Sequence, residues 1–295
     1  MNMKIKKMLA RILIISIFAY LFYRLYLNWG TLATQDFQFN YLYLILAILT
    51  FIFFYFLEGV GYDLFVKLVH ARVPFRKVLK ARYVSDMGRY IPGKVWTYLG
   101  RIYFLRKYDI SKMQVLVSSL LEMALMVLGG VLIFLLSLIF WSVNLGNWLY
   151  LLLIIIPLIF ISTHPKVLNK LLNIVERIRK KEQVKIKTKY SSILAMTLFY
   201  LFYWIVHGLG AFFVINAITP LSIIKLPIIM GIFAIAWVLG FVSFLAPGGL
   251  GIREGILAYF LIYLIPEPIS IIVVLVMRVL LTVIEGLYAL ISLKF

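Results

Sequence analysis

Two Pro-Gly breaks beside charged residues interrupt a chain that is otherwise apolar. The first is Arg-Tyr-Ile-Pro-Gly-Lys at residues 89–94, and the second is Ala-Pro-Gly-Gly-Leu-Gly-Ile-Arg-Glu at residues 246–254. A helix that breaks inside hydrocarbon frees backbone N–H and C=O groups, which protein or a water-filled cavity must satisfy. Charge at that depth is costly and usually functional, and paired Pro/Gly-broken segments indicate a transport site. The chemistry that these breaks favour is recognition of a charged group inside a membrane.

The composition is that of a membrane protein. The 295 residues are 64% hydrophobic and 14% charged, with a mean hydropathy of +1.03. No polar stretch is long enough to hold a soluble core, there is no cysteine, and the three histidines lack metal-ligand spacing. The net charge of +19 falls in loops between apolar runs, which favours topology signals and contacts with anionic lipid over nucleic-acid binding.

The predicted fold class is an all-α polytopic membrane protein with two Pro-Gly-broken or re-entrant elements. Residues 1–295 form a single transmembrane domain with about eight hydrophobic segments. They lie at roughly 8–27, 41–65, 113–140, 147–163, 190–217, 226–245, 254–265 and 269–293.

Basic residues predict the orientation of these segments. Twelve of them fall in 66–112 and nine in 164–189, whereas 28–40, 141–146 and 266–268 contain none. The positive-inside rule then places both termini in the cytoplasm of a plasma-membrane protein. Segment 254–265 is too short to cross about 30 Å of hydrocarbon, so it is either a re-entrant arm or, as we prefer, a half-helix that starts at depth.

Two further hypotheses concern organisation. Residues at about 165–181 alternate leucine and lysine faces, which predicts an amphipathic helix on the inner leaflet, with a solvated basic linker as the alternative. The segments also divide four and four, so 1–146 and 147–295 could be two repeats, each carrying one Pro-Gly break.

The first polar constellation spans 82–107, where basic residues alternate with tyrosine and tryptophan. Asp86 lies four residues after Arg82 and three before Arg89, so on a helix it can pair with either arginine. Lys94 and Arg101 are seven residues apart and would share a helix face, from which they could hold a phosphate. The alternative is a basic interfacial helix that only sets orientation.

The second constellation is the glycine-rich break. Glycines such as Gly249 and Gly251 permit positive φ and close approach of the backbone. A helix beginning after them would point free N–H groups and its positive dipole end into the break, and Arg253 adds a formal charge. Glu254 could simply complement that dipole, and the alternative reading of the break is a tight interhelical turn.

Ionisable residues inside the apolar segments form the third set. Glu122 lies about ten residues into its segment, and Arg278 is near the middle of the last one. Arg278 and Glu285 lie on one polar stripe of the predicted helix. Ionisable residues within a membrane usually face the interior of the bundle and form ion pairs, so we expect Arg278 to pair with Glu122 or Glu254. Glu58 is expected to reach the membrane interface.

The two breaks, together with Gly100-Arg101, residues 105–111, Glu122 and Arg278, resemble the lysylphosphatidylglycerol synthase transmembrane-region family of flippase-like membrane proteins. In two-domain members, this region moves an aminoacylated phosphatidylglycerol made by a separate cytoplasmic domain. The resemblance covers most of the chain but no synthase domain, and therefore implies a stand-alone lipid translocase.

The function that we predict is movement of a lipid head group between leaflets. The lipid would be an anionic or aminoacylated phospholipid, or a polyprenyl-phosphate-linked lipid, and a separate lipid-modifying enzyme is an expected partner. The expected substrate-binding residues are Arg89, Lys94, Arg101, Glu122, Gly249, Gly251, Arg253, Glu254, Arg278 and Glu285. No nucleotide, metal or nucleophile motif occurs, so no cofactor and no catalytic residue are expected. The alternatives are a membrane-embedded lipid transferase with Glu122 or Glu254 as general base, and a non-catalytic scaffold.

Overall fold

The structure, a computed structural model, describes residues 16, 19–20, 23–24, 26–27, 39–69, 73–91, 95–141, 189–243 and 247–295. Every regular element within these residues is a helix or a 3-10 turn. Segment 147–163, the amphipathic helix at about 165–181, Lys94 and most of segment 8–27 lie outside the described residues, as does the boundary between the two hypothetical repeats.

Among the described residues, five helices are long and apolar enough to cross a membrane. They are α3 (Tyr41–Val69), α6 (Lys112–Ser137), α9 (Tyr190–Ile218), α10 (Leu226–Val242) and α12 (Glu267–Ser292). The 3-10 turn η3 (Leu138–Phe140) extends α6, and η4 (Ile223–Lys225) precedes α10. These helices match the predicted segments to within a few residues, which confirms a polytopic α-helical membrane protein.

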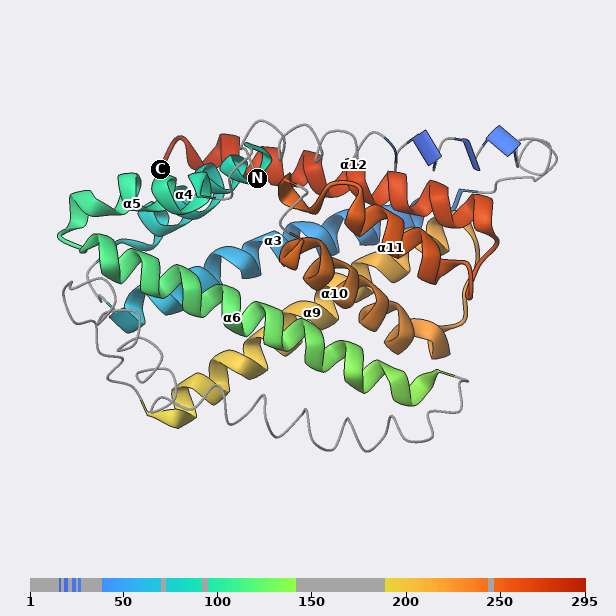
Figure 1. The fold of residues 1–295 in the computed structure, drawn as a ribbon, viewed down its shortest axis with the longest axis horizontal. Coiled ribbons are helices and arrows are strands. Elements are labelled where there is room, and N and C mark those ends of the chain that lie inside the picture. Colours follow the sequence, from blue (N-terminus) through green and yellow to red (C-terminus); the bar gives the residue numbers. More distant parts are fainter. Residues whose placement is uncertain are drawn as a thin grey trace, which may run out of the picture.

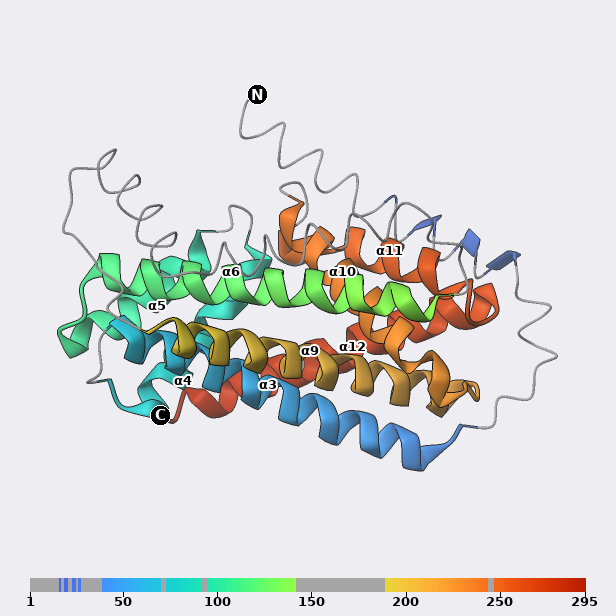
Figure 2. The ribbon, with the colours of Figure 1, turned by 90° about the horizontal axis from the view of Figure 1, so that it is seen from below.

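The long helices run along one axis of the molecule (Figures 1 and 2). The end of α3, the starts of α6 and α9, and the C-terminus lie at one end of this axis. The start of α3, the ends of α6 and α9, and the start of α12 lie at the other. The first end also carries two short helices, α4 (Phe75–Asp86) and α5 (Trp96–Leu105).

The described residues on either side of the first break form a helical hairpin. α4 continues into the 3-10 turn η1 (Met87–Tyr90), and α5 returns beside α4 before the 3-10 turn η2 (Arg106–Tyr108). A Cβ on Gly100 would lie 2.6 Å from Oγ of Ser85, so the two arms approach closely because glycine occupies this position. Lys77 and Lys80 donate to the carbonyls of Phe295 and Leu293, which fastens α4 to the C-terminal end of α12.

The second break forms the tip of a hairpin between α10 and α11 (Ile252–Leu261), with the 3-10 turn η5 (Pro247–Gly249) between them. Gly248, Gly249 and Gly251 have φ of 62°, 72° and 81°, which confirms that this break needs the left-handed backbone region. A Cβ on Gly249 would lie 3.1 Å from the carbonyl oxygen of Gly240, so the tip also packs backbone against α10.

The tips of the two hairpins touch each other. A Cβ on Gly248 would lie 3.7 Å from Cγ of Arg89 and 3.7 Å from Cδ1 of Tyr90, which places η5 against η1. The turns η1 and η5, which are far apart in the sequence, are therefore neighbours inside the helical bundle.

Close helix packing in the bundle depends on glycine, and this gives a first test. A Cβ on Gly208 of α9 would lie 2.6 Å from Cα of Met230 in α10, whereas a Cβ on Gly286 of α12 meets nothing within 4 Å. We expect Gly208→Ala to lower the free energy of unfolding by about 1–3 kcal/mol through overpacking. Gly286→Ala should instead be neutral or stabilising, because alanine is the better helix former. Thermal unfolding of the purified proteins in detergent would measure both, and equal melting temperatures would contradict the packing.

Candidate functional site

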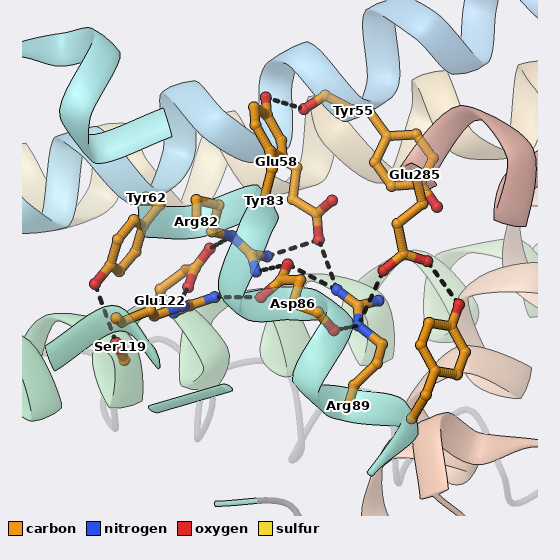
Figure 3. A network of polar contacts seen from close by, with 12 residues as sticks. Tyr55, Glu58, Tyr62, Arg82, Tyr83, Asp86, Arg89, Ser119, Glu122 and Glu285 are labelled. Atoms are coloured by element: carbon orange, nitrogen blue, oxygen red, sulfur yellow. Dashed lines mark hydrogen bonds and ion pairs between the residues drawn. The ribbon is translucent and has the colours of Figure 1, made fainter. Parts of the chain in front are cut away.

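A buried network of charged side chains lies where α3, α4, α6 and α12 meet (Figure 3). In the described part of the chain it joins three arginines to four carboxylates, a formal charge of 3 − 4 = −1. Its members are Arg82, Arg89, Arg101, Glu58, Asp86, Glu122 and Glu285. Because an unpaired buried charge is strongly destabilising, these groups must satisfy one another.

Arg82 of α4 is the centre of this network. Its Nη2 lies 2.6 Å from Oε1 of Glu58, its Nε lies 3.1 Å from Oε1 of Glu122, and its Nη1 donates to Asp86. The side chain is only 3% exposed. One guanidinium thus ties α4 to α3 through Glu58 and to α6 through Glu122.

Arg101 connects the returning arm of the first hairpin to the same carboxylates. Its Nη1 lies 2.8 Å from Oε2 of Glu122, its Nη2 lies 3.2 Å from Oδ1 of Asp86, and its guanidinium lies 4.2 Å from the centre of the Tyr62 ring. Arg101 is therefore buried and engaged by protein groups on several sides.

Asp86 accepts contacts from all three arginines of the network. Burial alone would raise the pKa of its carboxyl group, but the charges of Arg82, Arg89 and Arg101 outweigh burial and lower the pKa to about 2. Asp86 consequently stays ionised at physiological pH and holds the three guanidinium groups together.

Arg89 lies at the edge of the network, at the tip of the first hairpin. Its Nη2 lies 2.7 Å from Oδ2 of Asp86, and its Nε lies 3.2 Å from Oε1 of Glu285 on α12. The next residue, Tyr90, donates its hydroxyl to Oε2 of Glu285 at 2.8 Å. Arg89 is 29% exposed, in contrast to the buried Arg82 and Arg101.

A second charged group surrounds the start of α11. Nη1 of Arg278 lies 3.2 Å from Oε1 of Glu254, and the other oxygen of this carboxylate accepts the backbone N–H of Gly251 at 2.7 Å. Of the two carboxylates that the sequence offered as partners of Arg278, the structure selects Glu254. The Arg278 guanidinium also lies 5.9 Å from the centre of the Tyr90 ring, so the second group borders the tip of the first hairpin.

A small pocket between α11 and α12 joins these charges to apolar side chains. Arg253, Glu254 and Arg278 supply its polar wall. The apolar wall consists of Leu257, Val274, Met277 and Leu281. Two cations and one carboxylate leave the pocket with a surplus positive charge.

Arg253 differs from the arginines of the first network. Its side chain is partly buried, and within the described residues its polar contact is Nε2 of His207 at 3.3 Å, with no carboxylate in an ion pair. Burial and then the charge of Arg278 lower its pKa, against the opposing effect of Glu254. The pKa of Arg82, by contrast, is raised well above its usual value because carboxylates outweigh burial. Among the described arginines that are not exposed, Arg253 is thus the one that forms no ion pair with a carboxylate.

The structure divides the expected binding residues between the two groups. The first network contains Arg89, Arg101, Glu122 and Glu285, and the second group contains Gly249, Gly251, Arg253, Glu254 and Arg278.

Glu58, expected at the interface, is instead 5% exposed and paired with Arg82, because the first hairpin inserts a guanidinium beside it. Glu58, Arg82 and Asp86 are network members outside the expected binding residues. The sequence predicted the pairing of Arg82 with Asp86 but not that of Arg82 with Glu58. The signal that could have found this second pair is a carboxylate within the apolar run 41–65 and a matching arginine on the next helix.

The fold and this site define a class: a polytopic membrane protein with two broken hairpins and a charged interior. The family model described as lysylphosphatidylglycerol synthase TM region matches residues 8–287, and the chain therefore belongs to this family. No synthase domain is evident in the sequence. No curated protein matches the chain.

Proposed function

We propose that this chain is a lipid translocase that moves a phosphate-bearing lipid head group between the leaflets of the membrane. The substrate class is an anionic or aminoacylated phospholipid, or a polyprenyl-phosphate-linked lipid. The observation that carries the proposal is Arg253, a guanidinium at the start of α11 that forms no ion pair within the described residues. A cation at that depth is stabilised by an anionic ligand.

The pocket beside Arg253 is lined by both cationic and apolar side chains, which suit the head group and the acyl chains of a lipid. Arg253 and Arg278 offer donors to phosphate oxygens, and the apolar residues of α11 and α12 offer contacts to the first part of an acyl chain. Val279 and Val283 of α12 are 64% and 54% exposed, so the surface next to Arg278 suits hydrocarbon. The acyl chains would stay in the bilayer while the head group passes the hairpin tips.

The two hairpins would supply the path for the head group. In this proposal α11 is a half-helix that starts at depth, since its ten residues rise only about 15 Å and Glu254 at its start pairs with the middle of α12. The first hairpin enters from the opposite end of the bundle, and the tips meet at Gly248. Such opposed broken helices place irregular backbone where protein or a cavity can satisfy it.

The proposal extends to location and partners. The protein would lie in the plasma membrane with both termini in the cytoplasm, because the basic residues of 66–112 then face inward. A separate lipid-modifying enzyme could supply an aminoacylated or glycosylated substrate.

The test is lipid movement in vesicles that contain the purified protein. We expect the wild-type protein to move fluorescent phosphatidylglycerol to the outer leaflet, and Arg253→Gln to slow this about 10- to 100-fold, the loss of one charge-assisted contact of about 1.5–3 kcal/mol. Lys225→Gln, at the start of the same hairpin, is the matched control and should retain the rate.

Two outcomes would overturn the proposed function. If neither phosphatidylglycerol nor a polyprenyl phosphate moves faster than in empty vesicles, the protein is not a translocase for phosphate lipids, and a scaffold becomes the better reading. If Arg253→Gln moves lipid at the wild-type rate, the pocket at α11 is not the binding site.

A further inference from the structure

Glu285 of α12 depends on one cation. Within the described residues, Arg89 is the arginine that pairs with it, at 3.2 Å, and its remaining side-chain contact is the hydroxyl of Tyr90 at 2.8 Å. Burial and the Glu285 charge raise the pKa of Tyr90, so its hydroxyl remains protonated and acts as the donor. Glu285 is only 8% exposed and has little water to replace a lost partner.

Arg89 is also the arginine of the first network that an anion can reach. It is 29% exposed, and Gly248 at the tip of the second hairpin lies against it. Tyr90, the next residue, lies beneath Arg278 of the second group. A phosphate that moves from the pocket of Arg253 and Arg278 toward the other end of the bundle would therefore meet Arg89 next.

An anion that binds Arg89 would compete with Glu285 for the same guanidinium. Glu58 would keep Arg82 at 2.6 Å and Asp86 would keep Arg82 and Arg101, but Glu285 would be left with Tyr90 alone. A buried carboxylate without a cation is unstable in its charged form, and binding a proton removes that charge.

We propose that anion binding at Arg89 and proton binding at Glu285 are linked, so that a phosphate-bearing head group passes this point together with one proton. The inference rests on the proposed function for its substrate. The proton comes from bulk water and resides on a carboxylate oxygen of Glu285 while the anion occupies Arg89. It returns to water when the anion leaves and Arg89 pairs with Glu285 again.

Glu285, rather than a neighbour, is the proton acceptor because of its surroundings. The titratable and charged groups that face it from the packed elements lie on α3, α4, η1, α11 and α12. Tyr55, Glu58, Arg89 and Tyr90 interact with it directly. Arg82, Tyr83, Asp86, Arg253 and Arg278 in turn surround those four. The other two carboxylates in this set still have an arginine when Arg89 is withdrawn. Glu58 keeps Arg82, and Asp86 keeps Arg82 and Arg101.

The linkage has a measurable sign. Reciprocity requires that protonation strengthen anion binding as much as the anion strengthens protonation. The affinity for the anion should therefore rise as pH falls, by about tenfold for each pH unit at most, because each bound anion brings one proton with it.

Calorimetry of purified protein with dioctanoyl-phosphatidylglycerol tests this linkage. Repeating the titration in buffers of different ionisation enthalpy gives the number of protons taken up per lipid. We expect uptake approaching one proton for the wild-type protein and none for Glu285→Gln, which should still bind lipid because it mimics the protonated acid. Glu267→Gln, the same substitution at the start of α12, is the matched control and should keep the uptake.

A ligand-free measurement tests the second half of the argument. In Arg89→Gln the guanidinium is absent, so infrared spectra near neutral pH should contain a new carboxylic-acid C=O band. This band should persist in Arg89→Gln/Glu58→Gln and vanish in Arg89→Gln/Glu285→Gln. Absence of the band, or its loss only with the Glu58 substitution, would overturn the assignment to Glu285.

The outcomes separate this inference from the proposed function. Lipid that binds and moves in vesicles without proton uptake would overturn the linkage and leave the translocase intact. Proton-linked binding without movement in vesicles would support the linkage and overturn the translocase.

Discussion

Replacing Arg82 by methionine should lower the free energy of unfolding by about 3–5 kcal/mol, the usual cost of removing one partner from a buried ionic network. The guanidinium contacts Glu58, Asp86 and Glu122, which are all almost fully buried. Methionine fills much of the volume but leaves these carboxylates with Arg89 and Arg101 as their remaining cations. The loss should exceed that of any surface substitution on the same helix.

The matched control for this prediction is Arg76→Met. Arg76 is exposed on the first turn of the same helix, so its replacement should change the free energy of unfolding by no more than about 0.5 kcal/mol. Thermal unfolding of purified protein in one detergent compares the two. Similar melting temperatures for both variants would mean that water reaches the three carboxylates and that the network is not closed.

A rescue variant separates charge from packing. Adding Glu58→Gln to Arg82→Met removes one of the orphaned carboxylates and should restore part of the lost stability, because the residual excess of negative charge falls. No restoration would assign the effect of Arg82→Met to lost packing instead.

The long helices could be predicted from the sequence because a segment that crosses hydrocarbon must be long and apolar. Apolar runs such as 41–65 must form helices that satisfy their own backbone, so length and hydropathy suffice. Ion pairs within one helix could also be predicted, because residues three or four positions apart lie on the same helix face. Arg82, Asp86 and Arg89 have this spacing, and Asp86 does pair with both arginines.

The long-range parts of the network could not be predicted in this way. Glu58 meets Arg82 across 24 positions, and Arg101 meets Glu122 across 21, through a hairpin whose direction the sequence does not state. The resemblance and the charge pattern suggested Arg101 as a phosphate ligand. The structure places its guanidinium between Asp86 and Glu122, and its role as a phosphate ligand stays a prediction.

The contact between η1 and η5 brings together two charged groups of unequal composition. The first network holds one carboxylate more than its arginines require, and the second holds one arginine more than its carboxylate requires. Because Arg89 and Tyr90 lie against Gly248, these opposite surpluses face each other across the hairpin tips. An anion would be drawn to the second group and repelled by the first, unless Arg89 is released from Glu285.

The second large effect is expected at Arg278. Arg278→Met should lower the free energy of unfolding by about 2–4 kcal/mol, because it leaves Glu254 at 2% exposure without its cation. Glu254→Gln should cost less. Arg278 is 19% exposed and can turn toward water or lipid head groups, and the glutamine oxygen can still accept the N–H of Gly251.

The double variant Arg278→Met/Glu254→Gln should be more stable than Arg278→Met alone, since neither partner is then left charged. Thermal unfolding of the four proteins gives the coupling energy directly. Additive effects would show that Arg278 and Glu254 are independently solvated and that their 3.2 Å contact contributes little.

Lipid movement in the same double variant separates stability from function. The restored protein lacks one of the two cations in the pocket between α11 and α12, so it should fold but move phosphatidylglycerol no faster than Arg278→Met. If stability and movement return together, Arg278 serves only to pair with Glu254, and Arg253 alone receives the phosphate. If stability returns without movement, the guanidinium of Arg278 has two roles. It neutralises Glu254 when no lipid is bound, and it turns to the head group when lipid enters. The partial exposure of its side chain allows this change of partner.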